Sequence, residues 1–404
     1  MSFAKSNLSR PEVTALNRVC SIFAQMLEFF PRLEFEAAVR EHQAERHARG
    51  FRCWTQFVSM LFCQLGHAQS LREITGGLAA CEGKLRHLGV ESPPKRSTLA
   101  YANEHRPWEL FRTVFENLFQ RCSAEAAHRG LRKFRFKNKL LSLDATLIPL
   151  CLSAFDWALY RRSKGAVKLH LVLDHDGYLP QFAVISDGKT SDIQAARGLN
   201  YTPGTILVFD RGYQDFRWWL ELSRQKVFFV TRLKDNAEYG IVEQRPVDGA
   251  KQILRDEVIL LTKTQEAGSL ARLRRIEVWV EDKQEPMVFV TNHLKLAAAT
   301  IAAIYKDRWQ IEQFFKSLKQ SLRIKTFVGT SANAVMVQIW TALIAMLLVR
   351  YLQLRSTFGW SLSNLIALLR HQLFVYRDLI AWLNQPYQPP PERWAPDQLP
   401  LVLR

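Results

Sequence analysis

The order of strand-like and helix-like segments after residue 131 constrains the fold of this chain more than any other feature of its sequence. Three runs with the composition of strands come first, LLSLDATLIPL, VKLHLVLD and YLPQFAVIS, and the turn DHDG between the last two predicts a hairpin. A helix that begins near Ser191, the strand TILVFD and a helix containing FRWWLEL follow. Strands that alternate with helices in this way predict an α/β fold with a mixed sheet.

The segments on either side of this core have different patterns. Residues 1–130 carry apolar positions at helical spacing, as in CSIFAQMLEFF and WTQFVSMLFCQL, which predicts an all-α N-terminal domain. Short strand-like runs separated by turn residues predict a β-rich insertion over residues 226–292. Residues 293–385 are again helical in pattern and complete the core begun by 131–225, while the tail 386–404 is too rich in proline for regular structure.

The charge of the chain favours a polyanionic partner. Lys and Arg number 55 against 38 Asp and Glu, a formal net charge of +17, and binding of phosphates by such a surface is driven by counterion release. A soluble basic protein without such a partner has the same composition. Two helices that begin near Ser70 and Ser97, with Lys95 and Arg96 before the second, predict either a helix-turn-helix-like unit that reads a DNA groove or a plain helical pair.

Other sequence features exclude several classes of protein. The six cysteines include no C-x-x-C pair, which argues against zinc and favours free thiols in a reducing cytoplasm. The first residues lack the apolar segment of a secretory signal. The uncharged stretch 331–349 has the length of a membrane span, but its polar residues and the lack of a second such segment predict a buried core helix instead. We therefore expect a cytoplasmic protein that does not enter a membrane.

Three carboxylates have the setting of metal ligands. Asp144 interrupts an otherwise apolar strand, where a carboxylate is costly unless it is compensated. Asp210 ends the apolar strand TILVF, and ligands collect at the carboxyl ends of strands. Glu312 is on a helix, and the three together offer the oxygen ligands of two hard cations. For each aspartate alone, a turn or a helix cap is an equally good interpretation.

The helix around Glu312 carries further charged side chains on the same face. Tyr305, Arg308, Glu312 and Lys319 are offset by 3, 4 and 7 residues, which at 3.6 residues per turn places them within about 60° of one another. Such a face combines a metal ligand with groups that bind phosphates. A solvent-exposed face with salt bridges has the same spacing.

Resemblance to a known family separates these interpretations. Tyr305-x2-Arg308-x3-Glu312-x6-Lys319 resembles the Tyr-Arg-Glu-Lys signature of bacterial insertion-sequence DDE transposases of the IS-four family. LLSLDATLI around Asp144 and VFDRGY around Asp210 resemble the first and second acidic motifs of that family. The resemblance covers about residues 135–350 and extends more loosely to the N-terminal helices.

The resemblance implies both a fold and an activity. The fold is a ribonuclease H-like mixed sheet with a β-rich insertion, preceded by a helical DNA-binding domain. The activity is cut-and-paste transposition: Mg²⁺-dependent hydrolysis at terminal inverted repeats, a hairpin on the transposon end, and strand transfer into a target. Two Mg²⁺ ions are implied, with Mn²⁺ as a possible substitute. The implied partner is double-stranded DNA bound by a homodimer on paired ends near the nucleoid, with no small-molecule substrate.

The resemblance also implies roles for individual residues. Asp144, Asp210 and Glu312 are the implied metal ligands and catalytic residues. The implied DNA contacts are made by Tyr305, Arg308, Lys319 and Arg211, and by Trp309, which is expected to stack against a displaced base. Relatives can place a second aromatic residue in the last strand of the insertion, where this chain offers Met287 and Phe289 in PMVFVTN.

Two alternative functions and three further residues complete the predictions. A ribonuclease H-like endonuclease without strand transfer needs the same carboxylates, and a catalytically inactive repressor needs only the DNA-binding surface. His170 and His175 have the pattern of strand and turn residues. Asp192 has the pattern of a helix N-cap.

Overall fold

The computed structural model describes residues 20–388, apart from 47, 49, 152, 162–163, 248–251, 262–271, 323 and 325. Its α-helices are α1 (Ile22–Leu27), α2 (Arg32–Glu41), α3 (Cys53–Leu65), α4 (Leu71–Ala79), α5 (Glu82–Leu85), α6 (Arg96–His105), α7 (Glu109–His128), α8 (Asp192–Arg197), α9 (Phe216–Arg224), α11 (Ala298–Asp307), α12 (Trp309–Ser321), α13 (Ala332–Arg355), α14 (Leu362–Gln372) and α15 (Leu379–Asn384). Short 3₁₀ helices include η3 (Arg211–Tyr213). The strands are β1 (Leu140–Leu150), β2 (Leu159–Arg161), β3 (Lys164–Asp174), β4 (Leu179–Asp187), β5 (Ile206–Phe209), β6 (Phe228–Arg232), β7 (Tyr239–Gln244), β8 (Ile253–Leu261), β9 (Arg272–Val280) and β10 (Glu285–Thr291).

Five strands make up the mixed sheet of the core. β1 lies at the centre, with β3 antiparallel on one side and β5 parallel on the other, and β4 and β6 continue these two directions. The spatial order of these five strands is β4–β3–β1–β5–β6, where α8 leads from β4 into β5 and α9 connects β5 to its parallel neighbour β6. The predicted fold class, a ribonuclease H-like mixed sheet preceded by a helical region, is confirmed.

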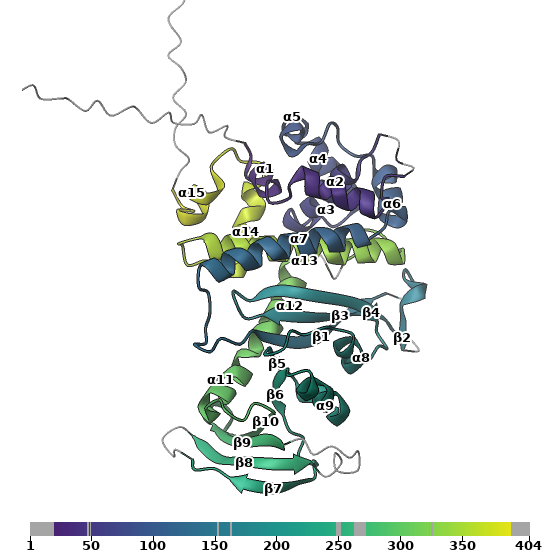
Figure 1. Cartoon of the computed structure of the whole chain (residues 1–404). Helices are drawn as coiled ribbons and strands as arrows, with labels where there is room; N and C mark the ends of the chain where they lie inside the picture. Colours follow the sequence, from purple (N-terminus) through teal and green to yellow (C-terminus); the bar gives the residue numbers. More distant parts are fainter. Residues whose placement is uncertain are drawn as a thin grey trace, which may run out of the picture.

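The strands of the predicted insertion extend this sheet instead of forming a separate one. β10 pairs antiparallel with β6, placing Phe289 beside Arg232, and β9, β8 and β7 follow in antiparallel order. β6 itself is parallel to β5, so the first strand of the 226–292 segment belongs to the parallel part of the sheet. The described strands therefore form one sheet of ten, which runs from the core into the insertion (Figure 1).

Alternating side chains of the central strands face different helices. Leu207 and Phe209 of β5 pack with Trp218 and Trp219 of α9, and their neighbour Val208 packs with α11 on the opposite side. This alternation follows from the two-residue period of a strand. The side of β1 that carries Leu140, Ser142 and Asp144 is therefore the side over which α11 lies.

A layer of helices covers the β3–β4 side of the sheet (Figure 1). α13 lies at its centre and packs against α7, α3 and β4. It is long and apolar enough to cross a membrane, but 83% of its most apolar window is buried inside the protein, as expected for a core helix. The N-terminal and C-terminal helices share one hydrophobic core, and the backbone of Ser21 forms a β-bridge with Tyr376.

Candidate active site

The pairing of β1 with β5 brings the two predicted aspartates together. Leu143 of β1 lies opposite Phe209 of β5 in a parallel register. The residues that follow these two, Asp144 and Asp210, are therefore neighbours. Asp144 accepts a hydrogen bond from its neighbour Ala145 at 2.8 Å. Asp210 directly follows β5 and caps η3, with one carboxylate oxygen 2.8 Å from the amide nitrogen of Gly212.

The third carboxylate is on α12, which packs against β1. The sequence pattern predicted one continuous helix here, but the structure has two, α11 and α12, which meet at Arg308. Hydrogen bonds from Arg308 to Tyr305 and from Ile311 to Arg308 span three residues instead of four, which is the tighter 3₁₀ spacing. Glu312 lies in the first turn of α12, which crosses β1.

Arg308 lies between two of the carboxylates. One guanidinium nitrogen is 2.7 Å from Glu312 and another is 3.8 Å from Asp144, and the residue is buried to all but 8% of its surface. Burial acts to lower the pKa of the guanidinium, but the interactions with Tyr305, Glu312 and Asp144 outweigh it. Arg308 is therefore a fixed positive charge that neutralises acids which would otherwise repel one another.

The electrostatics of Asp144 reflect this crowding. Burial raises its pKa from 3.8 to about 6, the Ala145 amide and Arg308 oppose that rise, and the negative charges of Glu312 and Asp210 add to it. Asp144 thus interacts through space with each of the other two predicted acids. A carboxylate that is desolvated and surrounded by like charges gains most from a bound cation.

Two further predicted residues flank this group. The ring of Tyr305 lies 5.4 Å from the Arg308 guanidinium and 4.9 Å from the ring of Phe289. Lys319, nearly three turns along α12, donates a hydrogen bond to Thr146 Oγ at 2.5 Å. Thr146 is two residues beyond Asp144 and so faces the same side of β1.

The remaining predicted contact residues differ in exposure. Trp309 is 54% exposed directly beside Arg308, and Arg211 is exposed beside Asp210. Met287 and Phe289 are both buried, with Phe289 packed on Tyr305, so neither offers a free stacking surface.

The donor set fits a hard divalent cation. All three acids supply carboxylate oxygens, the ligands preferred by Mg²⁺. Among the described residues, however, no three His, Cys, Asp or Glu side chains are close enough to hold an ion as they stand. In this metal-free arrangement the guanidinium of Arg308 contacts both acids, at 3.8 Å from Asp144 and 2.7 Å from Glu312.

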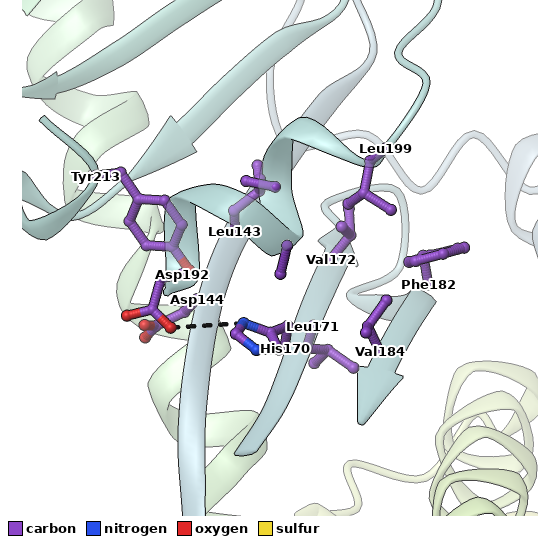
Figure 2. Close-up of a pocket in the computed structure, with 12 residues that line it drawn as sticks. Leu143, Asp144, His170, Leu171, Val172, Phe182, Val184, Asp192, Leu199 and Tyr213 are labelled. Atoms are coloured by element: carbon purple, nitrogen blue, oxygen red, sulfur yellow. Dashed lines mark ion pairs between the residues drawn. The ribbon is translucent and has the colours of Figure 1, made fainter. Parts of the chain in front are cut away.

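The position of Asp192, which lines a small pocket beside Asp144, corrects one sequence-based prediction. Asp192 was expected to cap a helix, but Ser191 occupies the cap position and Asp192 is the first residue of α8. Its carboxylate lies 3.2 Å from Lys168 and 3.5 Å from His170. Figure 2 shows Asp192 and His170 near Asp144 at one end of the pocket, with apolar side chains at the other.

Sequence reasoning missed a buried hydrogen-bonded cluster next to the site. The cluster joins Ser142 of β1, His175 in the turn after β3 and Asp307 at the end of α11, which are hydrogen-bonded in series. The only local signal was a histidine among acids in a turn, and that pattern has an ordinary structural explanation.

Comparison with known proteins gives this geometry its family. A model described as a transposase DDE domain matches residues 135–348, and a domain of unknown function matches residues 19–91. The chain is 31% identical over 304 residues to the "Putative transposase y4zB" of Sinorhizobium fredii, covering 74% of this chain and 83% of the relative. It is 27% identical to the "Probable transposase for insertion sequence element IS5377" of Geobacillus stearothermophilus, covering 63% and 67%.

Among solved structures, the piggyBac transposase synaptic complex with hairpin DNA aligns over 88% of this chain and 80% of its own, with a TM-score of 0.44 and 9% identity. Similarity at that level is too low to define the fold. The domain match covers more than half of the chain, and the relative from Sinorhizobium fredii is matched over most of its length. The chain therefore belongs to the DDE transposases of bacterial insertion sequences, metal-dependent enzymes that cleave and join DNA strands.

Proposed function

We propose that Asp144, Asp210 and Glu312 are the catalytic metal ligands of this transposase. The observation that carries the proposal is the adjacency of Asp144 and Asp210 at the β1–β5 pair, with Glu312 linked to Asp144 through Arg308. Two Mg²⁺ ions, or Mn²⁺ in their place, would activate the attacking oxygen and stabilise the leaving oxygen when bound here.

The other residues near the carboxylates would position the DNA. Arg308 would exchange Glu312 for a phosphate of the cleaved end, since a guanidinium binds both groups by the same paired hydrogen bonds. Tyr305, Lys319 and Arg211 would hold neighbouring phosphates. Trp309 would stack against a base displaced during hairpin formation, a role supported by its exposure beside Arg308.

The finer assignments belong to the same proposal. We assign the enzyme to the IS-four family, acting by cut-and-paste at terminal inverted repeats as a homodimer on paired ends. The helices of 1–130 would bind the ends, 131–225 and 293–385 would form the catalytic core, and the insertion of 226–292 would lie against the captured end. The tail, 386–404, falls almost entirely outside the described residues. In the cell the enzyme would act in the cytoplasm at the nucleoid.

Two rival activities predict different products from one assay. A labelled duplex carrying the flanking element end is incubated with Mg²⁺ or with chelator, and the products are separated on a denaturing gel. Nicking at the element boundary followed by hairpin and joined products supports the proposal. Cutting without joining would indicate an endonuclease, and binding without cutting under any metal would indicate a repressor.

A further inference from the structure

Three buried polar side chains form a continuous hydrogen-bonded chain beside the carboxylates. The Ser142 hydroxyl oxygen is 2.6 Å from Nε2 of His175, and Nδ1 of the same ring is 2.6 Å from a carboxylate oxygen of Asp307. An ionised carboxylate only accepts, so Nδ1 donates to Asp307, and Nε2 then accepts from the serine hydroxyl in the neutral ring.

The order of these groups is that of a hydrolytic triad, but their burial excludes that activity. Ser142 is 0% exposed, and His175 and Asp307 are each 3% exposed. A nucleophile that no substrate can reach does not react, so the chain of hydrogen bonds acts on the structure.

The members of the cluster connect the elements that carry the proposed ligands. Ser142 is two residues before Asp144 and faces the same side of β1. Asp307 ends α11, immediately before Arg308 and the α12 helix of Glu312. The backbone amide of His175 also donates to the carbonyl of Leu140 at 3.1 Å, which fixes the ring-bearing turn on the same strand.

Other charged and polar groups hold Asp307 ionised. Burial acts to raise the pKa of Asp307, but hydrogen bonds from His175 and Lys133 outweigh it and lower the pKa below 3.8. Tyr178 donates to both carboxylate oxygens at 3.1 and 3.2 Å, and Arg350 lies 5.6 Å from the Tyr178 ring. The carboxylate is thus held from three sides at the end of α11.

The turn that carries His175 also holds two acids that form ion pairs. Asp174 and Asp176 flank His175 in sequence, and both pair with Lys139, at 2.5 and 3.3 Å. Arg132 also lies 3.5 Å from Asp176, so the two acids have two cationic partners, and the hydrogen bonds of the His175 ring are those with Ser142 and Asp307.

We propose that Ser142, His175 and Asp307 are positioning residues that fix α12 on β1 and so set the separation of Glu312 from Asp144. The inference rests on the proposed metal-ligand roles of those two carboxylates. Groups that hydrogen bond directly to metal ligands influence metal affinity strongly, since their loss typically weakens binding by about 10–100-fold, and we expect this range for a cluster that acts through β1 and α11. Misplacement of a reacting group by about 1 Å likewise costs about 100-fold in reaction rate.

The test is Mn²⁺ binding to the full chain, measured from the electron paramagnetic resonance signal of the free ion. His175→Ala is expected to weaken Mn²⁺ binding by about 10–100-fold. His175→Asn is expected to recover part of the affinity, because its amide nitrogen can replace Nδ1 as the donor to Asp307. Ser142→Ala, which removes only a hydroxyl, is expected to show a smaller loss in the same direction and decides the test if His175→Ala does not fold.

Matched variants separate positioning from general destabilisation. Asn292 makes a comparable polar link, with hydrogen bonds to Phe229, Ser223 and Val227, and within the described part of the chain it has none to β1, α11 or α12. Asn292→Ala is therefore expected to lower stability and leave Mn²⁺ affinity unchanged. Wild-type Mn²⁺ affinity in folded His175→Ala would overturn the inference, and Ser142→Ala decides in the same way if His175→Ala does not fold. A loss of affinity in Asp144→Ala would at the same time uphold the proposed ligands. Wild-type affinity in Asp144→Ala would overturn the ligand roles themselves.

Discussion

Replacing Asp144 by Asn is predicted to stabilise the metal-free protein while abolishing its activity. Asn retains an oxygen that accepts the hydrogen bond from the Ala145 amide, so the main structural change is the loss of a charge. That charge is unfavourable in the folded state because the side chain is 22% exposed and lies near Glu312 and Asp210. A site that binds a cation commonly costs stability in the absence of that cation.

The magnitude of this stabilisation and its dependence on pH follow from the raised pKa of Asp144. A rise from 3.8 to about 6 corresponds to about 3 kcal/mol at 1.36 kcal/mol per unit. For an acid whose pKa is raised by folding, the destabilisation is absent below pH ~4, grows as pH rises toward 6, and is complete above it. For 404 residues, 3 kcal/mol corresponds to a Tm change of about 3–4 °C.

Thermal unfolding without metal, at pH values from about 4 to 8, measures this effect. Asp144→Asn should match the wild type at the acid end and exceed its Tm at the neutral end. Added Mg²⁺ should raise the Tm of the wild type and have little effect on the variant. A variant that is less stable than the wild type at pH ~8 would refute the reasoning, since the carboxylate would then be stabilising where it is ionised.

Three further substitutions test other parts of the structure. Arg308→Ala should lower the stability of the metal-free protein by about 3 kcal/mol, and added Mg²⁺ should restore part of that stability. Unchanged metal-free stability in a denaturant titration would show that Arg308 does not neutralise the charges of Asp144 and Glu312. Trp309→Ala should change stability by less than about 0.5 kcal/mol but reduce the yield of hairpin products on a gel, and Trp309→Phe should retain that yield. Equal hairpin yields in the two variants would exclude stacking by Trp309. Arg274→Ala breaks the buried ion pair with Asp256 and should lower the free energy of unfolding by about 3–5 kcal/mol without altering the Mg²⁺ concentration needed for nicking. A shift in that concentration would show that the insertion influences the metal site.

Local sequence patterns predicted the strands that carry the aspartates and the helical segment that carries Glu312. Such patterns report the period of one element at a time, and Asp144 stood out because a carboxylate in an apolar run has few inexpensive explanations. They also predicted α13 as a core helix, and most of that helix is buried.

Features that depend on contacts between distant residues were not predictable in this way. Arg308, where α11 meets α12, pairs with Asp144, 164 positions earlier in the chain, and a helical pattern carries no sign of the break or of this partner. Asp307 and His175 look like ordinary helix-end and turn residues until folding buries them together. The shared core of the N-terminal and C-terminal helices likewise depends on which surfaces meet.

The most direct test of the central claim is single-turnover nicking of an end-labelled duplex by Asp144→Ala, Asp210→Ala and Glu312→Ala, with binding to the same duplex measured in parallel. Asp282→Ala, which removes an exposed acid of the insertion, is the matched control. We predict that the first three variants bind the duplex and do not nick it at any Mg²⁺ or Mn²⁺ concentration, while the control nicks like the wild type. Metal-dependent nicking by any of the three at the wild-type rate would contradict the assignment of that residue as a ligand.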